Sequence, residues 1–78
     1  MPTQSYKGFT ITGRPYQLHA TRQWAIDLEI SRRGRHRSFS AQDHAATEAE
    51  ALAACLEFGR RIIDGQVPGC SVAALQRR

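Results

Sequence analysis

Apolar residues recur three or four positions apart over residues 47–65, which is the spacing of one face of an α-helix. The predicted face contains Leu52, Cys55, Leu56, Gly59, Ile62 and Ile63. Thr47, followed three residues later by Glu50, is typical of a capping box at a helix start. Gly65 suits the left-handed position after a helix, and Pro68 prevents simple continuation. The pattern predicts one amphipathic helix with Leu56 on its buried face.

Upstream of this helix the spacing changes to alternation. Over residues 24–30 the apolar positions are Trp24, Ile26, Leu28 and Ile30, with Ala25, Asp27 and Glu29 between them. This period of two predicts a strand with one wet face. Gly34 indicates a reversal, after which 35–40 returns antiparallel. A turn centred on Arg33 and Gly34 pairs Leu28 with Phe39 and Glu29 with Ser38. Because Arg-Gly is not a favoured turn pair, a longer loop of the same parity is an alternative.

Residues 6–12 predict a further strand, with Phe9 and Ile11 on one side. Gly13 and Pro15 interrupt it, and alternation resumes in the opposite parity at Tyr16, so we expect a bulge or bend near Gly13. Residues 71–75 can form a short helical turn capped by Ser71.

These elements predict an α+β fold in a single domain over residues 1–78. Three strands form an antiparallel meander packed against one long C-terminal helix (βββα), with a short extra helical turn at the C-terminus. We expect Gly59 to let the helix approach the sheet closely. A chain of 78 residues buries only roughly 60% of its unfolded surface, so dimerisation can add to its stability.

The chain resembles a group of small uncharacterised bacterial proteins. The resemblance is carried by Tyr6-x-Gly8-x-x-Ile11, Trp24 in a strand ending Ile30-x-Arg32, Thr47-x-x-Glu50-Ala51 and Gly59-Arg60-x-Ile62-Ile63-Asp64-Gly65. It covers most of the chain and implies a three-stranded sheet with a C-terminal helix. It implies no activity, because that group has no established function or catalytic residues.

Charge adds a hypothesis about partners. The chain has 11 Lys and Arg against 7 Asp and Glu, for a net charge of +4, which favours acidic partners. The densest cluster is Arg32, Arg33, Arg35 and Arg37 at the predicted hairpin turn. These arginines can contact the phosphates of a nucleic acid or another polyanion, or form a solvated turn with no partner. Acidic residues on the wet sheet face and the inward position of the aromatics Trp24 and Phe39 argue against a stacking platform for single strands.

The sequence predicts no enzyme, with no catalytic residue, cofactor or metal. His19, His36 and His44 are scattered, and no serine or cysteine lies in a nucleophile motif. Asp27 and Glu29 share a strand face, where such a pair is usually solubilising. Cys55 and Cys70 lack the paired spacing of zinc ligands, and we expect neither to form a disulfide.

The remaining interpretation is a small non-catalytic binding or protein-interaction module. A three-stranded sheet exposes an edge strand, which can form a homodimer. The apolar C-terminal segment, with Val72, Ala73 and Leu75, can do the same or fold back on its own core. No apolar run approaches the roughly 20 residues of a membrane span, and MPTQSYKG lacks the apolar part of a signal peptide. We therefore expect a cytoplasmic protein that contacts no membrane.

Overall fold

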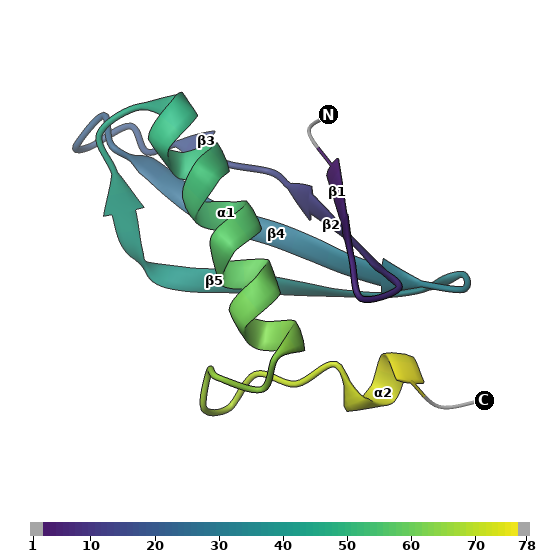
Figure 1. The fold of residues 1–78 in the computed structure, drawn as a ribbon. Helices are drawn as coiled ribbons and strands as arrows, with labels where there is room; N and C mark the ends of the chain where they lie inside the picture. The colour runs from purple at the N-terminus through teal and green to yellow at the C-terminus, as the bar shows by residue number, and fades with distance from the viewer. Residues whose placement is uncertain (1–2, 77–78) are drawn as a thin grey trace.

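Five strands form one antiparallel sheet, and a long helix covers one of its faces (Figure 1). The computed structural model describes residues 3–76. Its elements are β1 (Thr3–Tyr6), β2 (Phe9–Gly13), β3 (Tyr16–Gln17), β4 (Trp24–Arg32), β5 (Arg35–Ala45), α1 (Glu48–Ile63) and α2 (Ala73–Gln76). The α+β class and the single long helix are as the sequence predicts.

β4 is the central strand of the sheet. β2 and β3 pair with one side of β4, where β2 is aligned by Gly13 opposite Leu28 and β3 by Tyr16 opposite Ala25. β5 pairs with the other side, and β1 pairs with β2. β5 is therefore the edge on one side of β4, and β1 together with the two-residue strand β3 forms the edge on the other side.

The prediction of three strands is wrong, because the range 6–12 contains a turn. Lys7 and Gly8 both have positive φ, at 50° and 86°, and link β1 to β2 as a two-residue hairpin turn. Such turns usually contain Asn-Gly or Asp-Gly. Here the turn is Lys-Gly within a stretch that alternates like a strand, so the sequence did not indicate the reversal. The bend expected near Gly13 takes the form of a break, after which β3 continues along β4.

The predicted register of the β4–β5 hairpin is confirmed. Leu28 lies opposite Phe39 and Glu29 opposite Ser38. Arg33 and Gly34 form the two-residue turn, with φ of 51° and 81°, so the longer loop is not needed. β5 extends to Ala45, beyond the range expected for it, and its pairing is irregular between Ser40 and His44, where residues 41–43 lie opposite the single residue Ile26 of β4.

Both ends of α1 are as predicted. The Thr47 hydroxyl accepts a hydrogen bond from the Glu50 N–H at 3.2 Å and caps the first turn. At the other end Gly65 has a φ of 74°. The N–H groups of Gly65 and Gln66 donate to the carbonyls of Ile62 and Arg61, which is the hydrogen-bond pattern of a Schellman motif.

The buried face of α1 is rotated from the predicted one. Its buried residues are Ala51, Cys55, Gly59 and Ile62, whereas Leu52, Leu56 and Ile63 are half-buried on its flank. A Cβ built at Gly59 would lie 2.6 Å from Cγ2 of Ile11, so the helix backbone meets β2 directly. Small residues therefore face the sheet at the closest approach, and Leu56, which was predicted to be buried, is only partly buried beside the core.

The C-terminal segment folds back on the same core. The Ser71 hydroxyl accepts a hydrogen bond from the Ala73 N–H at 3.1 Å, which gives α2 the cap predicted for it. Val72 and Leu75 are both buried and join the core cluster of the sheet and α1. The chain itself thus covers the apolar surface that those two residues would have offered to a partner.

Candidate functional site

The predicted arginine cluster lies at the end of the β4–β5 hairpin, where three of its four members contact other parts of the chain. The Arg37 guanidinium donates to the carbonyl of Ser71 at 3.2 Å, and that of Arg35 donates to the carbonyl of Ala74 at 3.4 Å. The Arg32 guanidinium lies 5.2 Å from the centre of the Phe9 ring. These contacts give the arginines a structural role, because they hold the C-terminal segment and cover the core.

Arg33 differs from these three residues, because it occupies the hairpin turn itself and is exposed. Sequence reasoning missed a further cation, Lys7, at the same end of the sheet. Thr10 of β2 lies opposite Ser31 of β4, so the turn that contains Lys7 lies at the same end of the sheet as the turn that contains Arg33. Both turns place a cation before a glycine, a shared pattern that could have signalled the first hairpin. We call Lys7, Arg32, Arg33, Arg35 and Arg37 the basic end.

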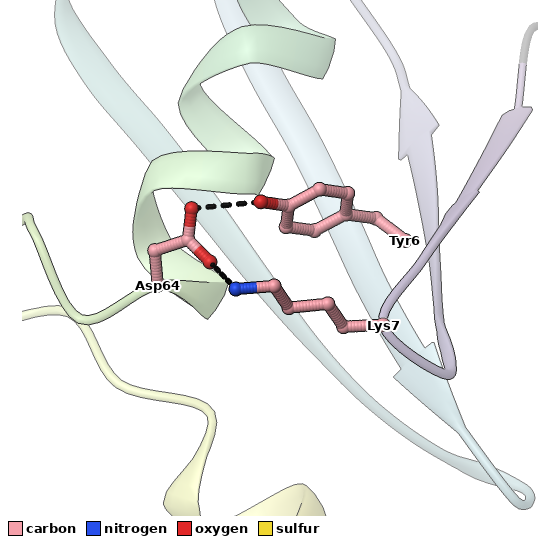
Figure 2. A network of polar contacts seen from close by, with 3 residues as sticks. All are labelled: Tyr6, Lys7 and Asp64. Atoms are coloured by element: carbon pink, nitrogen blue, oxygen red, sulfur yellow. Dashed lines mark hydrogen bonds and ion pairs between the residues drawn. The ribbon is translucent and has the colours of Figure 1, made fainter.

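Lys7 is also part of a network that fixes the β1 edge to α1 (Figure 2). Its ammonium donates to Asp64 at 2.6 Å, and the Tyr6 hydroxyl donates to the other carboxylate oxygen at 2.8 Å. The hydrogen bond from Lys7, followed by that from Tyr6, lowers the pKa of Asp64, while the hydrogen bond to Asp64 raises the pKa of Lys7. One turn earlier on the helix, Arg60 donates to the Gln4 side chain at 2.6 Å. The β1 edge is thus held by side chains of α1.

The opposite edge, β5, is held to the C-terminal segment by Arg35 and Arg37 near the hairpin turn, and no hydrogen bond ties the rest of it to α1 among residues 3–76. Within residues 3–76 β5 pairs with β4 alone, and its residues are mostly exposed. A groove runs beside it, between β5, α1 and residues 67–70, which we call the β5 groove. It is lined by Ala41, Asp43, Ala54, Phe58, Arg61 and Val67.

Two charged residues of the β5 groove are available for contacts. Among the described residues, 3–76, neither Asp43 nor Arg61 has a hydrogen bond or an ion pair through its side chain, whereas Asp64 and Glu29 each have a cationic partner. The β5 groove therefore presents an acid and a base beside the half-buried ring of Phe58.

The uncovered face of the sheet carries the acidic pair noted in the sequence. Glu29 forms an ion pair with Arg14, and Asp27 accepts a hydrogen bond from the Ser40 hydroxyl at 2.7 Å. Phe39 is buried and Trp24 half-buried, on the side of the sheet that carries the core. These contacts make Asp27 and Glu29 parts of the surface structure of the sheet.

The remaining chemistry-bearing residues are dispersed. His19, His36 and His44 are all exposed, the first in a turn and the others on β5. Cys55 is buried, its thiol lies 3.2 Å from the carbonyl of Asp27, and burial raises its pKa. Within residues 3–76 no group of three or more His, Cys, Asp or Glu side chains can hold a metal ion, and no helix is long and apolar enough to span a membrane.

Comparison with known proteins adds no assignment. The chain matches no protein-family model, and a search of curated proteins finds no match.

Proposed function

We propose that this chain is a non-catalytic protein-interaction module that binds its partner through the free edge of β5 and the β5 groove. The observation that supports this proposal is the length of the open edge, since β5 has 11 residues and, among the described residues, no strand pairs with its outer side. Unpaired strand edges are templates for the addition of another strand.

The hairpin turn determines which backbone groups face outward. Because Arg33 and Gly34 form a two-residue turn, Arg32 and Arg35 are the pair that closes the hairpin with hydrogen bonds. From Arg35 to Ser40, where the pairing is regular, odd-numbered residues of β5 therefore direct their N–H and C=O groups toward β4. Even-numbered residues such as Ser38 direct theirs away from the sheet, where an added strand can pair with them.

The β5 groove supplies side-chain contacts for such a strand. Phe58 and Val67 offer apolar surface, and Asp43 and Arg61 offer charges of both signs. Main-chain hydrogen bonds give affinity in strand addition, and pockets for alternate side chains give specificity. This combination fits an extended polypeptide partner.

The experiment compares Ser38→Pro with Ser5→Pro. Proline removes the outward N–H at either edge and spares the ladder inside the sheet. Ser5 is the matched control, because it lies on β1, is exposed, and has the same outward phase relative to its own hairpin turn. Peptides selected from a random library on the wild type are then titrated by fluorescence anisotropy against both variants.

We expect Ser38→Pro to abolish peptide binding and Ser5→Pro to leave it within about threefold, a difference of less than about 1 kcal/mol. Circular dichroism checks that both variants are folded. Equal loss of binding in both folded variants, or a library that yields no peptide dependent on the β5 edge, would overturn the proposal.

A second candidate, contact with a nucleic acid or another polyanion, is favoured by the basic end. It gathers five cations, with Asp64 as the acid that contacts Lys7. The test is Arg33→Gln against Arg22→Gln. Both arginines are exposed turn residues with positive φ, at 51° and 59°, and they flank opposite ends of β4. If the basic end binds phosphates, the Arg33 change alone should weaken binding to duplex or single-stranded nucleic acid and lower its salt dependence. No binding by the wild type at low salt would reject this candidate.

A further inference from the structure

We propose that the partner inserts one large apolar side chain into a pocket at the irregular part of β5, and that a Lys or Arg of the same segment contacts Asp43 at the rim of that pocket. This inference rests on the proposed function and specifies the chemistry of the peptide that the β5 groove binds. The pocket is the part of the groove between residues 41–43 and α1, and we call it the bulge pocket.

A bulge in β5 opens this pocket. The strand pairs regularly with β4 up to Ser40, after which residues 41–43 lie opposite the single residue Ile26. A bulge bends its strand away from the regular ladder. Ile26 is 6% exposed and is the only buried residue among those that line the pocket, so it forms the floor.

The walls of the bulge pocket are apolar. Ala41 of β5 and Ala54 of α1 each contribute only a methyl group, and the half-buried ring of Phe58 also lines the pocket. The volume of the pocket is about 150 Å³. An apolar cavity of about this size can hold one benzene-sized group. The bulge pocket therefore fits a single Leu, Ile, Met or Phe side chain.

Three charged side chains complete the lining of the pocket: Asp43 from β5, and Glu57 and Arg61 from α1. All three are exposed, and within residues 3–76 none has a hydrogen bond or an ion pair through its side chain. Glu57 and Arg61 lie four residues apart on α1 with the acid first, which is the spacing and order at which opposite charges attract on a helix. Their charges offset each other, and Asp43 remains as the uncompensated charge.

The cations of the basic end lie too far from Asp43 to compensate it. Arg37 is the nearest of them along β5, and at roughly 3.3 Å per residue the strand between the two residues spans about 15 Å or more. The Debye length at physiological ionic strength is about 8 Å, so this interaction is largely screened. The rim of the bulge pocket therefore favours a cation, although the net charge of the chain is +4.

A strand added to the regular part of β5 brings its side chains to this pocket. Its backbone pairs with the outward groups of Ser38 and Ser40, and the bulge pocket begins at the next residue, Ala41. Alternate residues of a strand face the same side, so an apolar residue and a cation two positions apart both face α1. We therefore expect the partner segment to contain an apolar residue with Lys or Arg two positions from it.

Filling the pocket tests its role. Ala54→Leu places a leucine side chain in the bulge pocket, whereas Ala53→Leu adds the same side chain to the exposed surface of α1 and is the matched control. Peptides selected from a random library on the wild type are titrated against both variants by fluorescence anisotropy. We expect Ala54→Leu to weaken binding about tenfold or more, and Ala53→Leu to leave it within about threefold.

Thermal melts separate this effect from loss of structure. Leu and Ala have similar helix propensities, and filling a cavity commonly raises stability, so Ala54→Leu should melt at or above the wild-type temperature. Ala41→Leu fills the same pocket from β5, so the test does not depend on one variant. Folded Ala54→Leu and Ala41→Leu variants that both bind the peptides as the wild type does would overturn the inference.

Charge reversal tests the contact with Asp43. Asp43→Lys should weaken the binding of peptides that carry Lys two positions from the apolar residue by about threefold to fivefold, and the effect should shrink at high salt. Replacing that Lys by Glu in the peptide should restore binding to Asp43→Lys. Selected peptides that carry Asp or Glu at this position would show that Arg61 sets the charge preference, and would overturn the role of Asp43.

The failure of this inference is distinguishable from the failure of the proposed function. If the peptides lose binding in Ser38→Pro but bind Ala54→Leu and Ala41→Leu as they bind the wild type, the β5 edge is an interaction site and the bulge pocket is not part of it. If the library yields no peptide that depends on the β5 edge, both proposals are wrong.

Discussion

The two edges of this sheet differ in length and in their attachment to the rest of the molecule. β1 has four residues, and Tyr6 and Lys7 tie it and its turn to Asp64 at the end of α1 (Figure 2). Gln4 adds a hydrogen bond with Arg60 of the same helix. β5 has 11 residues, and its outer side faces the β5 groove. Proteins usually shorten or cover exposed edges to prevent unwanted pairing. Here β1 follows that rule and β5 departs from it, which is why we place the interaction site at β5.

The position of α1 accounts for the groove at the open edge. Gly59 brings the helix backbone onto Ile11 of β2, and a Cβ at Gly13 of the same strand would lie 3.2 Å from Cβ of Cys55. This close approach is on the side of the sheet that leads to β1. Over β5 the helix presents Ala54 and Phe58, and a groove remains between them and the strand. The close approach at Gly59 and Gly13 on the β2 side of the sheet is thus accompanied by the β5 groove on the other side.

The largest expected effect tests whether α1 is packed more tightly in the core than at the β5 groove. Ile62 is fully buried, so Ile62→Ala should lower the free energy of unfolding by about 2–5 kcal/mol. Phe58 is half-buried beside the groove, so Phe58→Ala should cost less than the roughly 3–5 kcal/mol of a buried phenylalanine. Urea denaturation of both variants measures the two losses in the free energy of unfolding. A greater loss from Phe58→Ala would mean that the helix packs more tightly over β5.

The next prediction tests the contact between α1 and β2. The new Cβ in Gly59→Ala would lie 2.6 Å from Cγ2 of Ile11, which is fully buried, so the helix or the packed side chains would have to shift. Overpacking costs about 1–3 kcal/mol, and we expect that loss to exceed the roughly 1 kcal/mol that alanine gains in helix propensity.

Ile11→Ala supplies the control for that contact. It removes the clashing atoms, so the two changes together should cost less than the sum of the single changes, with a coupling of about 0.5–3 kcal/mol. Additive losses in urea denaturation would show that Gly59 is not the point of closest approach.

The sequence predicted the elements whose signals are local. Thr47 and Gly65 bound the helix because capping depends on residues adjacent in the chain, and the register of Leu28 with Phe39 followed from parity alone. The Lys7 turn was missed because the residues around it alternate as a strand does. The rotation of the helix face was also missed, since it depends on which residue of another strand, Ile11, meets Gly59.

The candidate site was predicted only in part. The density of arginines at the hairpin was visible in the sequence, but their contacts with the carbonyls of Ser71 and Ala74 depend on where the C-terminal segment folds back. The β5 groove combines a strand, a helix and a loop, and no spacing of Asp43, Phe58 and Arg61 along the chain indicates that they line one surface. An exposed edge strand was predicted from the fold class, but not which edge remains open.

The two cysteines provide a smaller, kinetic test of the same difference between the core and the groove. Cys55 is buried and its pKa is raised by burial, whereas Cys70 is half-buried at the β5 groove. Because a thiol reagent attacks the thiolate, Cys70 should react faster by about tenfold or more at neutral pH. Mass spectrometry of the native protein over time gives both rates. Equal, rapid labelling would mean that α1 does not protect Cys55.

The smallest expected effect concerns the side chains that hold the β1 edge. The pKa of Asp64 is lowered in the folded chain, so its contribution to stability is present above the unfolded value of about 3.9 and is lost as pH falls through the folded value. The pKa of Lys7 is raised, so its contribution is present below its ordinary value of 10.5 and is lost as pH rises through the folded value. Thermal melts of Asp64→Asn should therefore differ most from the wild type between about pH 5 and 9, and the difference should shrink as the pH falls below about 4.

Asp43→Asn is the matched control at the open edge, because that carboxylate has no hydrogen bond or ion pair within residues 3–76. If it lowers the melting temperature as much as Asp64→Asn does, the network in Figure 2 does not hold the β1 edge, and the contrast between the two edges fails at that point.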